Sequence, residues 1–222
     1  ALWAAAYDEE ANPLLALEER TLRPLLPDLQ GKSALDLACG TGRWLGILLR
    51  RGAASVVGVD FCGPMLAQAA SKPGIRGRLV RADCEALPFR SEAADLAICS
   101  FALGYLPTLA GFATGLAQII RPGAQVFLSD LHPSAYERGW HRSFRTGTGV
   151  VEILSYCHSI ERVCGELRAH GFEQLRIAEP DFGEPEREIF RARGKAHLFD
   201  EVIGKPAIWV AQFQRARNSV LD

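Results

Sequence analysis

The chain has 222 residues, of which 48% are hydrophobic and 23% are charged, a composition typical of a globular protein with one sizeable core. Its formal net charge of -1 provides no field for a polyanion, which disfavours nonspecific nucleic-acid binding unless a local basic patch is present. The six cysteines form no CxxC pair, and no apolar run reaches the roughly 18 to 20 residues of a membrane helix. We therefore expect a soluble cytoplasmic protein with free thiols.

Residues 1–30 predict an N-terminal helix preceded by a lid. In "PLLALEERTLRPLLP" the leucines recur at helical spacing, which favours a helix packed on the edge of a sheet. From Ala34 on, short apolar runs alternate with helical patterns. The expected strands are "SALDLAC", "SVVGVD", "GRLVRAD", "ADLAICS" and "QVFLSD", and the expected helices cover about 42–51, 64–70 and 109–120.

The pattern becomes less regular after Asp130, and residues 132–158 have the polar, aromatic and glycine content of a loop that covers a site. A helix follows, with Ser159 as its N-cap and Gly171 just beyond its end, and then strands at "EQLRIAE" and "PAIWVAQFQ". These elements predict one α/β domain over residues 1–222, with a doubly wound, mostly parallel seven-stranded sheet covered by helices on both faces. Ligands bind such sheets beyond the carboxyl ends of the strands, where we expect the functional residues.

The stretch "ALDLACGTGRW" places a glycine turn directly after the first predicted strand. Its spacing is Gly40-x-Gly42 with the next glycine at Gly46, so the GxGxxG pattern of a dinucleotide fold is not met. A pyrophosphate needs several backbone N–H groups and a helix N-terminus aimed at it, whereas an uncharged linker needs only close backbone approach. The spacing argues against a dinucleotide-dependent oxidoreductase, which we keep as the last alternative.

The chain resembles the class I S-adenosylmethionine-dependent methyltransferases, in particular the subgroup that acts on small molecules and quinone precursors. The resemblance covers about residues 30–131 and rests on five motifs in order. These are "LDLACGTGRW", "VVGVDFCGPML", "RADCEALPF", "ADLAICSFALGYL" and "IIRPGAQVFLSD". It implies a Rossmann-like methyltransferase fold, with S-adenosylmethionine as the cofactor and S-adenosylhomocysteine as the product.

The resemblance also implies roles for single residues. Asp36 would anchor the glycine turn and the amino group of the cofactor, while Gly40 and Gly42 would let the backbone approach its amino-acid moiety. Asp60 would accept hydrogen bonds from both ribose hydroxyls, and Asp83 would accept from the adenine amine. Further expected contacts to the cofactor come from Tyr7, Ala38 (in place of the family's first glycine), Phe61, Met65, Cys84, Glu85, Leu87 and Ser100.

Methyl transfer from a sulfonium needs proximity, alignment and a dry cavity rather than a protein nucleophile, although an oxygen or carbon acceptor usually needs a base. The best-placed candidate base is His132, two residues after Asp130, with Tyr105 and His141 on the same rim. Aromatic residues in the segments expected to close the pocket would suit an apolar or cationic small molecule. They are Trp3, Tyr7, Tyr105, Tyr136, Trp140 and Tyr156.

Two features of the sequence narrow the class of methyl acceptor further. The fourth strand is followed by "SFALGY" and not by Asp or Asn before Pro-Pro and an aromatic, so the pattern of amine methylation on DNA is missing. The basic residues of "FGEPEREIFRARGKAH" are offset by glutamates, which favours a solvated helix face over an RNA-binding patch. We therefore predict a small-molecule acceptor. A tRNA or rRNA methyltransferase of the same fold and a non-catalytic cofactor-binding scaffold stay as alternatives, and the oligomeric state is left open.

Overall fold

The computed structural model describes residues 4, 7–8, 11–146 and 149–217. Its main sheet has the strand order β3-β2-β1-β4-β5-β9-β8. The strands are β1 (Ser33–Leu37), β2 (Ser55–Asp60), β3 (Leu79–Arg81), β4 (Ala94–Ser100), β5 (Ile120–Leu131), β8 (Phe172–Ala178) and β9 (Ile208–Arg215). Within this sheet β9 is antiparallel to both of its neighbours, and the other pairs are parallel. The prediction of a mostly parallel seven-stranded sheet is confirmed.

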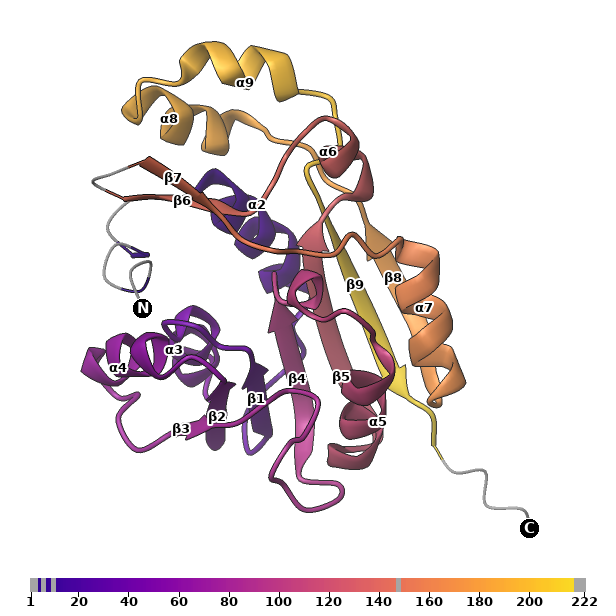
Figure 1. Ribbon diagram of the computed structural model, residues 1–222. Coiled ribbons are helices and arrows are strands. Elements are labelled where there is room, and N and C mark those ends of the chain that lie inside the picture. The colour runs from indigo at the N-terminus through magenta and orange to yellow at the C-terminus, as the bar shows by residue number, and fades with distance from the viewer. Residues whose placement is uncertain (1–3, 5–6, 9–10, 147–148, 218–222) are drawn as a thin grey trace.

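Helices cover both faces of the sheet, also as predicted (Figure 1). One face packs against α5 (Ala110–Ile119) and α7 (Ile160–Ala169). The other face packs against α2 (Pro13–Leu22), α3 (Arg43–Arg50), α4 (Gly63–Ser71), α8 (Glu184–Ala192) and α9 (Ala196–Val202). Successive side chains of a strand point to opposite faces of the sheet and so belong to two different cores. Leu35 and Leu37 lie in the first core, and Ala34 lies in the second.

Local sequence signals explain several element boundaries. Ser159 caps α7 by accepting a hydrogen bond from the backbone N–H of Arg162 at 3.2 Å, and Gly171 follows the helix with a φ of +79°, as the sequence predicted. The fifth strand begins earlier than the sequence predicted. It starts at Ile120, directly after α5, and includes Pro122 and Gly123, whereas the predicted strand began at Gln125.

The segment 132–158, expected as an irregular loop, contains regular elements. A short helix, α6 (Pro133–Glu137), is followed by a hairpin of β6 (Ser143–Thr146) and β7 (Gly149–Glu152). Short 3-10 turns occupy Arg23–Leu25 and Leu103–Tyr105. A search of the described residues finds no helix long and apolar enough to cross a membrane and no cluster suited to a metal ion.

Candidate functional site

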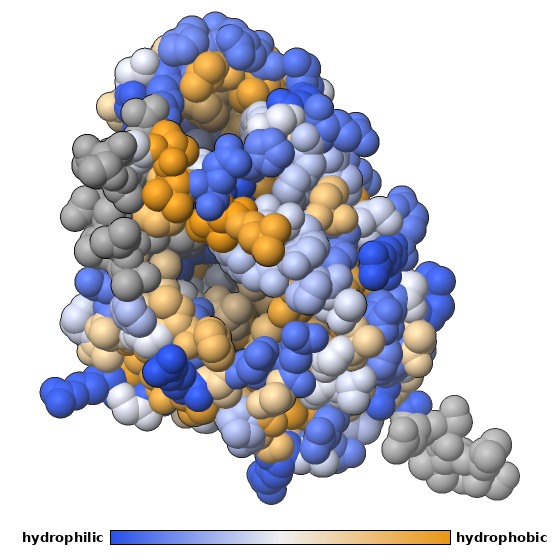
Figure 2. All heavy atoms as spheres, in the orientation of Figure 1, coloured by the Kyte–Doolittle hydropathy of each residue, from blue (hydrophilic) through white to orange (hydrophobic). Residues whose placement is uncertain are grey.

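A cavity of about 690 Å³ lies beyond the carboxyl ends of the parallel strands, within the size range of small-molecule sites. Figure 2 shows a hollow on this face of the molecule. The turns after β1, β2, β3 and β4 each contribute lining residues, and so do the N-terminal segment and the β6–β7 hairpin. The placement agrees with the rule that ligands bind open α/β sheets at their carboxyl edge.

The glycine turn after β1 requires unusual backbone angles. Ala38, Gly40 and Gly42 all have positive φ, of 52°, 55° and 79°. A Cβ on Gly42 would also lie 3.1 Å from Ile75 Cδ1, so glycine is needed there for space as well as for conformation. At Gly40 nothing lies within 4 Å of the position of a Cβ, and Gly40 lines the cavity. The turn therefore leaves a backbone cradle that a side chain would fill.

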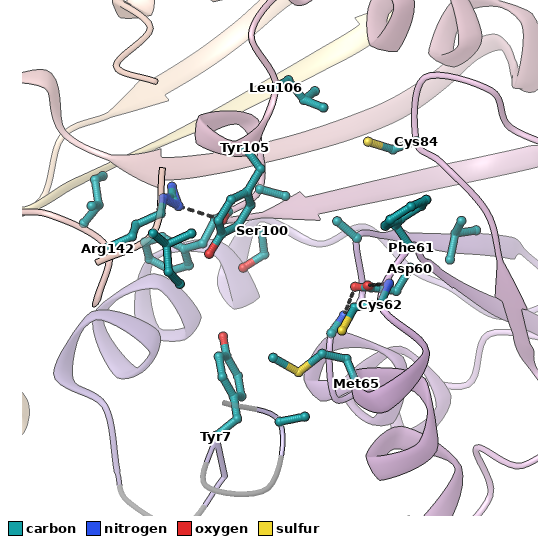
Figure 3. Close-up of a pocket in the computed structure, with 18 of the residues that line it drawn as sticks. Tyr7, Asp60, Phe61, Cys62, Met65, Cys84, Ser100, Tyr105, Leu106 and Arg142 are labelled. Carbon is teal, nitrogen blue, oxygen red and sulfur yellow. Dashed lines mark hydrogen bonds between the residues drawn. The ribbon is translucent and has the colours of Figure 1, made fainter. Parts of the chain in front are cut away.

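Asp60 ties this turn to the next one. One carboxylate oxygen accepts the backbone N–H of Gly40 at 2.7 Å, and the other accepts the backbone N–H of Cys62 at 2.7 Å (Figure 3). A carboxylate has about four acceptor positions, so two remain on a side chain that lines the cavity. Asp60 thus has the free acceptor capacity that two ribose hydroxyls need.

Asp36 lies beneath the glycine turn and is not among the residues that line the cavity. It is 2% exposed, and its Oδ2 accepts the backbone N–H of Leu45 at 3.1 Å, in the first turn of α3. Burial raises the pKa of its carboxyl group to about 8, although the nearby Arg43 guanidinium and the bond from Leu45 oppose the shift. In this structure Asp36 takes the place of an N-cap side chain, because the N-cap residue Gly42 has none.

The residues expected around the adenine line one end of the cavity together. They are Phe61, Met65, Asp83, Cys84 and Glu85, whereas Leu87 packs against the sheet core instead. Asp83 accepts the backbone N–H of Glu85 at 2.9 Å, which orders the turn. Phe61 is 69% exposed, an unusual position for a large apolar ring, and it offers a face on which a purine could stack.

Ser100 stands between the two ends of the cavity and belongs to a buried network. Its Oγ accepts a hydrogen bond from Arg43 Nη2 at 3.1 Å, and Arg43 forms an ion pair with Glu18 of α2. Glu18 is fully buried and also accepts from Trp44 Nε1 at 3.2 Å and from Ser129 Oγ at 2.7 Å. Sequence reasoning missed Glu18, although its position four residues from both Leu14 and Leu22 places it on the apolar face of α2.

The opposite end of the cavity contains Tyr7, Tyr105 and Arg142, with the apolar side chains of Leu106, Leu131, Phe144 and Ile153. Arg142 forms a buried ion pair with Asp130, donates from Nη1 to the Phe101 carbonyl at 3.1 Å, and lies 4.7 Å from the centre of the Tyr105 ring. Desolvation raises the pKa of Tyr105 to about 12 and also raises that of Tyr7, despite the opposing positive charges nearby. Both phenols are therefore protonated at neutral pH.

The predicted lid contributes in part. Tyr7 lines the cavity, and Asp8 accepts from Thr41 Oγ1 at 2.8 Å and pairs with Lys72 at 2.7 Å, which attaches this segment beside the glycine turn. Trp3 lies outside the described residues.

The candidate base His132 is engaged away from the cavity, which it does not line. Its Nδ1 accepts the backbone N–H of Ser134 at 3.1 Å, which caps α6, and its Nε2 lies 2.7 Å from Glu179 Oε2. His141 and Tyr105 do line the cavity. The structure thus brings two of the three predicted catalytic residues to the site, and it adds Arg142, for which the sequence carried no signal.

The chain is similar to methyltransferases in sequence and in fold. Residues 34–124 match the family described as a methyltransferase domain. A phthiotriol/phenolphthiotriol dimycocerosates methyltransferase of Mycobacterium leprae is 32% identical over 148 residues, covering 65% of this chain and 53% of the relative. A demethylmenaquinone methyltransferase of Thermus thermophilus is 36% identical over 107 residues, covering 46% of this chain and 48% of the relative.

The fold is matched over almost the whole chain. A crystal structure of an S-adenosylmethionine-dependent methyltransferase from Mesorhizobium loti aligns with a TM-score of 0.72 and 22% identity, covering 92% of this chain and 100% of that chain. The present chain spans about half the length of these two curated relatives, at 53% and 48%.

Proposed function

We propose that this chain is a class I S-adenosylmethionine-dependent methyltransferase, which transfers the methyl group of this donor to an oxygen, nitrogen or carbon nucleophile of a small molecule. The observation that carries the proposal is the continuous cavity. Asp60 and the glycine turn lie at one end, a second group of polar and apolar side chains lies at the other, and Ser100 stands between them.

The residues at the first end fit the donor. The space beside Gly40 suits the amino-acid part, the remaining acceptor positions of Asp60 suit the ribose hydroxyls, and the exposed ring of Phe61 suits the adenine face. When bound, the donor supplies an electrophilic methyl group on a positively charged sulfur. The chain's own residues then have to align the acceptor with that methyl and exclude water.

The second end of the cavity supports a small acceptor. Leu106, Leu131, Phe144 and Ile153 give it an apolar lining, and the hairpin β6–β7 and the N-terminal segment both contribute to the cavity wall. The names of the relatives, among them methyltransferases of demethylmenaquinone and of ubiquinone biosynthesis, agree with this class. Among the described residues of α8, Arg187 and Arg191 pair with Glu184 and Glu188, which argues against the RNA-methylating alternative.

Of the three residues predicted as catalytic, His141 is the one that both lines the cavity and can accept a proton at neutral pH. Tyr7 and Tyr105 hold their protons at neutral pH because desolvation raises their pKa, so they act as hydrogen-bond donors that position the acceptor. His132 as base stays a prediction from the sequence, and its contacts with Ser134 and Glu179 do not support it. The site therefore suits acceptors that are nucleophilic without a protein base, or acceptors whose proton His141 can take.

The test is a turnover assay that follows S-adenosylhomocysteine release with the labelled donor. Three acceptor sets are compared: phenols and hydroxyquinones, primary and secondary amines, and total tRNA. The proposal expects release with a small-molecule set and none with tRNA. Turnover on tRNA alone would replace it with the RNA alternative, and donor binding without any turnover would favour the scaffold.

A further inference from the structure

The acidic and basic side chains that line the cavity lie at opposite ends of it. Three carboxylates, those of Asp60, Asp83 and Glu85, line the end that fits the donor. Among the described lining residues, the two that can carry positive charge, Arg142 and His141, both belong to the opposite end. Figure 3 shows Arg142 and Tyr105 on one side of the cavity and Asp60 on the other. The end that fits the cationic donor is therefore lined by carboxylates, whereas the opposite end contains the permanent positive charge of Arg142.

Arg142 presents its charge to the cavity because its counter-ion lies behind it. Asp130 pairs with Arg142 but does not line the cavity. Its Oδ2 accepts the backbone N–H of Gly104 at 2.9 Å and its Oδ1 accepts that of Leu131 at 2.6 Å. The guanidinium packs closely on Gly104, where an added Cβ would lie 2.9 Å from Nη2. Arg142 is thus held in one place by groups outside the cavity.

One nitrogen of the Arg142 guanidinium makes no hydrogen bond to the described residues. Nη2 is used by Asp130 and Nη1 by the Phe101 carbonyl, but Nε has no hydrogen-bond partner among the described residues. Arg142 is 8% exposed and lines the cavity, so a small part of its side chain is accessible to a ligand. Five other buried side-chain atoms of the described residues also lack a hydrogen-bond partner, but Arg142 alone among these residues lines the cavity, where an acceptor can reach it.

We propose that the methyl acceptor carries an anionic oxygen, of a carboxylate or of an ionised enol or phenol, and that Arg142 binds this oxygen with Tyr105 as a second donor. The inference rests on the function proposed above and specifies its substrate class. The apolar body of the acceptor then lies against Leu106, Phe144 and Ile153. Charge-assisted hydrogen bonds are shorter and stronger than neutral ones, so a fixed guanidinium selects for an anion.

This substrate class differs from the apolar or cationic acceptor that the aromatic residues had suggested. The Tyr105 face that could attract a ligand cation is already occupied by the guanidinium of Arg142, at 4.7 Å from the ring centre. A cationic acceptor would have to approach that guanidinium directly, while an anion gains from it.

The test uses benzoate and benzamide, which have nearly the same shape and differ in charge. Each is titrated into protein saturated with S-adenosylhomocysteine, and binding is followed by ligand-detected NMR. We expect benzoate to bind at least ~10-fold more tightly than benzamide to the unmodified chain, in line with the greater strength of charge-assisted bonds. Equal binding of the two probes, or binding of neither, overturns the inference.

Three variants locate the effect. Arg142→Gln removes the cation but leaves Asp130 buried without its partner, so the double variant Asp130→Asn with Arg142→Gln is made as well. Both are expected to lose the preference for benzoate, whereas Arg176→Gln, which removes an exposed arginine of β8 outside the cavity, keeps it. A preference that survives in the folded double variant overturns the inference.

Binding of S-adenosylhomocysteine is measured first for each protein. If the unmodified chain binds it but shows no preference for benzoate, the substrate class is wrong and the proposed function stands. If the unmodified chain does not bind it, the proposed function itself fails.

Discussion

Replacement of Asp60 by alanine removes the acceptor that joins the glycine turn, the next turn and the donor. In the structure its two oxygens accept backbone N–H groups of Gly40 and Cys62, each at 2.7 Å. With the donor bound, we expect two further bonds to the ribose hydroxyls. A hydrogen bond to a charged group contributes about 1.5–3 kcal/mol, and some of the loss is recovered by water. A net loss of about 2 kcal/mol in binding free energy corresponds to a roughly 30-fold weaker affinity.

Calorimetric titration with S-adenosylhomocysteine measures this loss directly. The matched control is Asp28→Ala, since Asp28 is an exposed carboxylate that also accepts a backbone N–H, from Gln30 at 3.1 Å, and does not line the cavity. The control is expected to keep the affinity of the unmodified chain. An Asp60→Ala variant that binds S-adenosylhomocysteine as tightly as the control would refute the assignment of Asp60 to the donor.

Three further predictions concern stability in urea titrations. Because burial raises the Asp36 pKa to about 8, the native state keeps a proton that the unfolded chain releases above about pH 4, so this residue lowers the unfolding free energy as pH rises between these values. Asp36→Asn removes this pH dependence of the unfolding free energy, which is up to about 1.4 kcal/mol per pH unit. If the unfolding free energies of the two proteins changed with pH in parallel, the raised pKa of Asp36 would be contradicted. Glu18→Ala leaves the Arg43 network without its acceptor and costs about 3–5 kcal/mol. Glu188→Ala, in the exposed pair with Arg191 of α8, costs less than about 1 kcal/mol, and similar losses would count against the network. Gly58→Ala places a Cβ 2.6 Å from a leucine of α3 and costs roughly 1–3 kcal/mol, while Gly165→Ala, with nothing within 4 Å, gains about 0.5–1 kcal/mol; equal effects would refute the packing argument.

The sheet could be predicted because its strands are short apolar runs separated by helical patterns. The strands at 55–60 and 94–100 have the predicted bounds, and the cap at Ser159 is formed as expected. The hairpin β6–β7 could not be predicted in this way, since all four residues of β7 are exposed and the alternation of buried and exposed positions is missing.

Most residues that line the donor end of the cavity could also be predicted, because they lie at the ends of strands or directly after them. Asp60 closes β2, and Asp83 follows β3 by two positions. Asp36 is different because it is the fourth of the five residues of β1, and alternation turns it away from Leu35 and Leu37 toward α3. Asp36 is followed by one more strand residue and faces α3, whereas Asp60 and Ser100, the last residues of their strands, line the cavity.

The acceptor end depends on contacts between distant segments, which local patterns do not encode. Arg142 reaches the cavity only because Asp130, at the end of β5, and Gly104, after β4, hold its guanidinium in place. His132 is much closer to Asp130 in the sequence than Arg142 is, but its ring contacts Ser134 and Glu179 instead. Closeness in the sequence therefore favoured His132, which stays a prediction, while Arg142 was found only through its tertiary ion pair with Asp130.

In the proposed function the glycine turn and Asp60 bind S-adenosylmethionine in the cavity. The most direct measurement is calorimetric titration of the purified chain, freed of bound ligand, with S-adenosylmethionine, S-adenosylhomocysteine and NADH in parallel. We expect micromolar binding of the first two and no binding of NADH. Binding of NADH alone would contradict it and return the chain to the dinucleotide-dependent oxidoreductases.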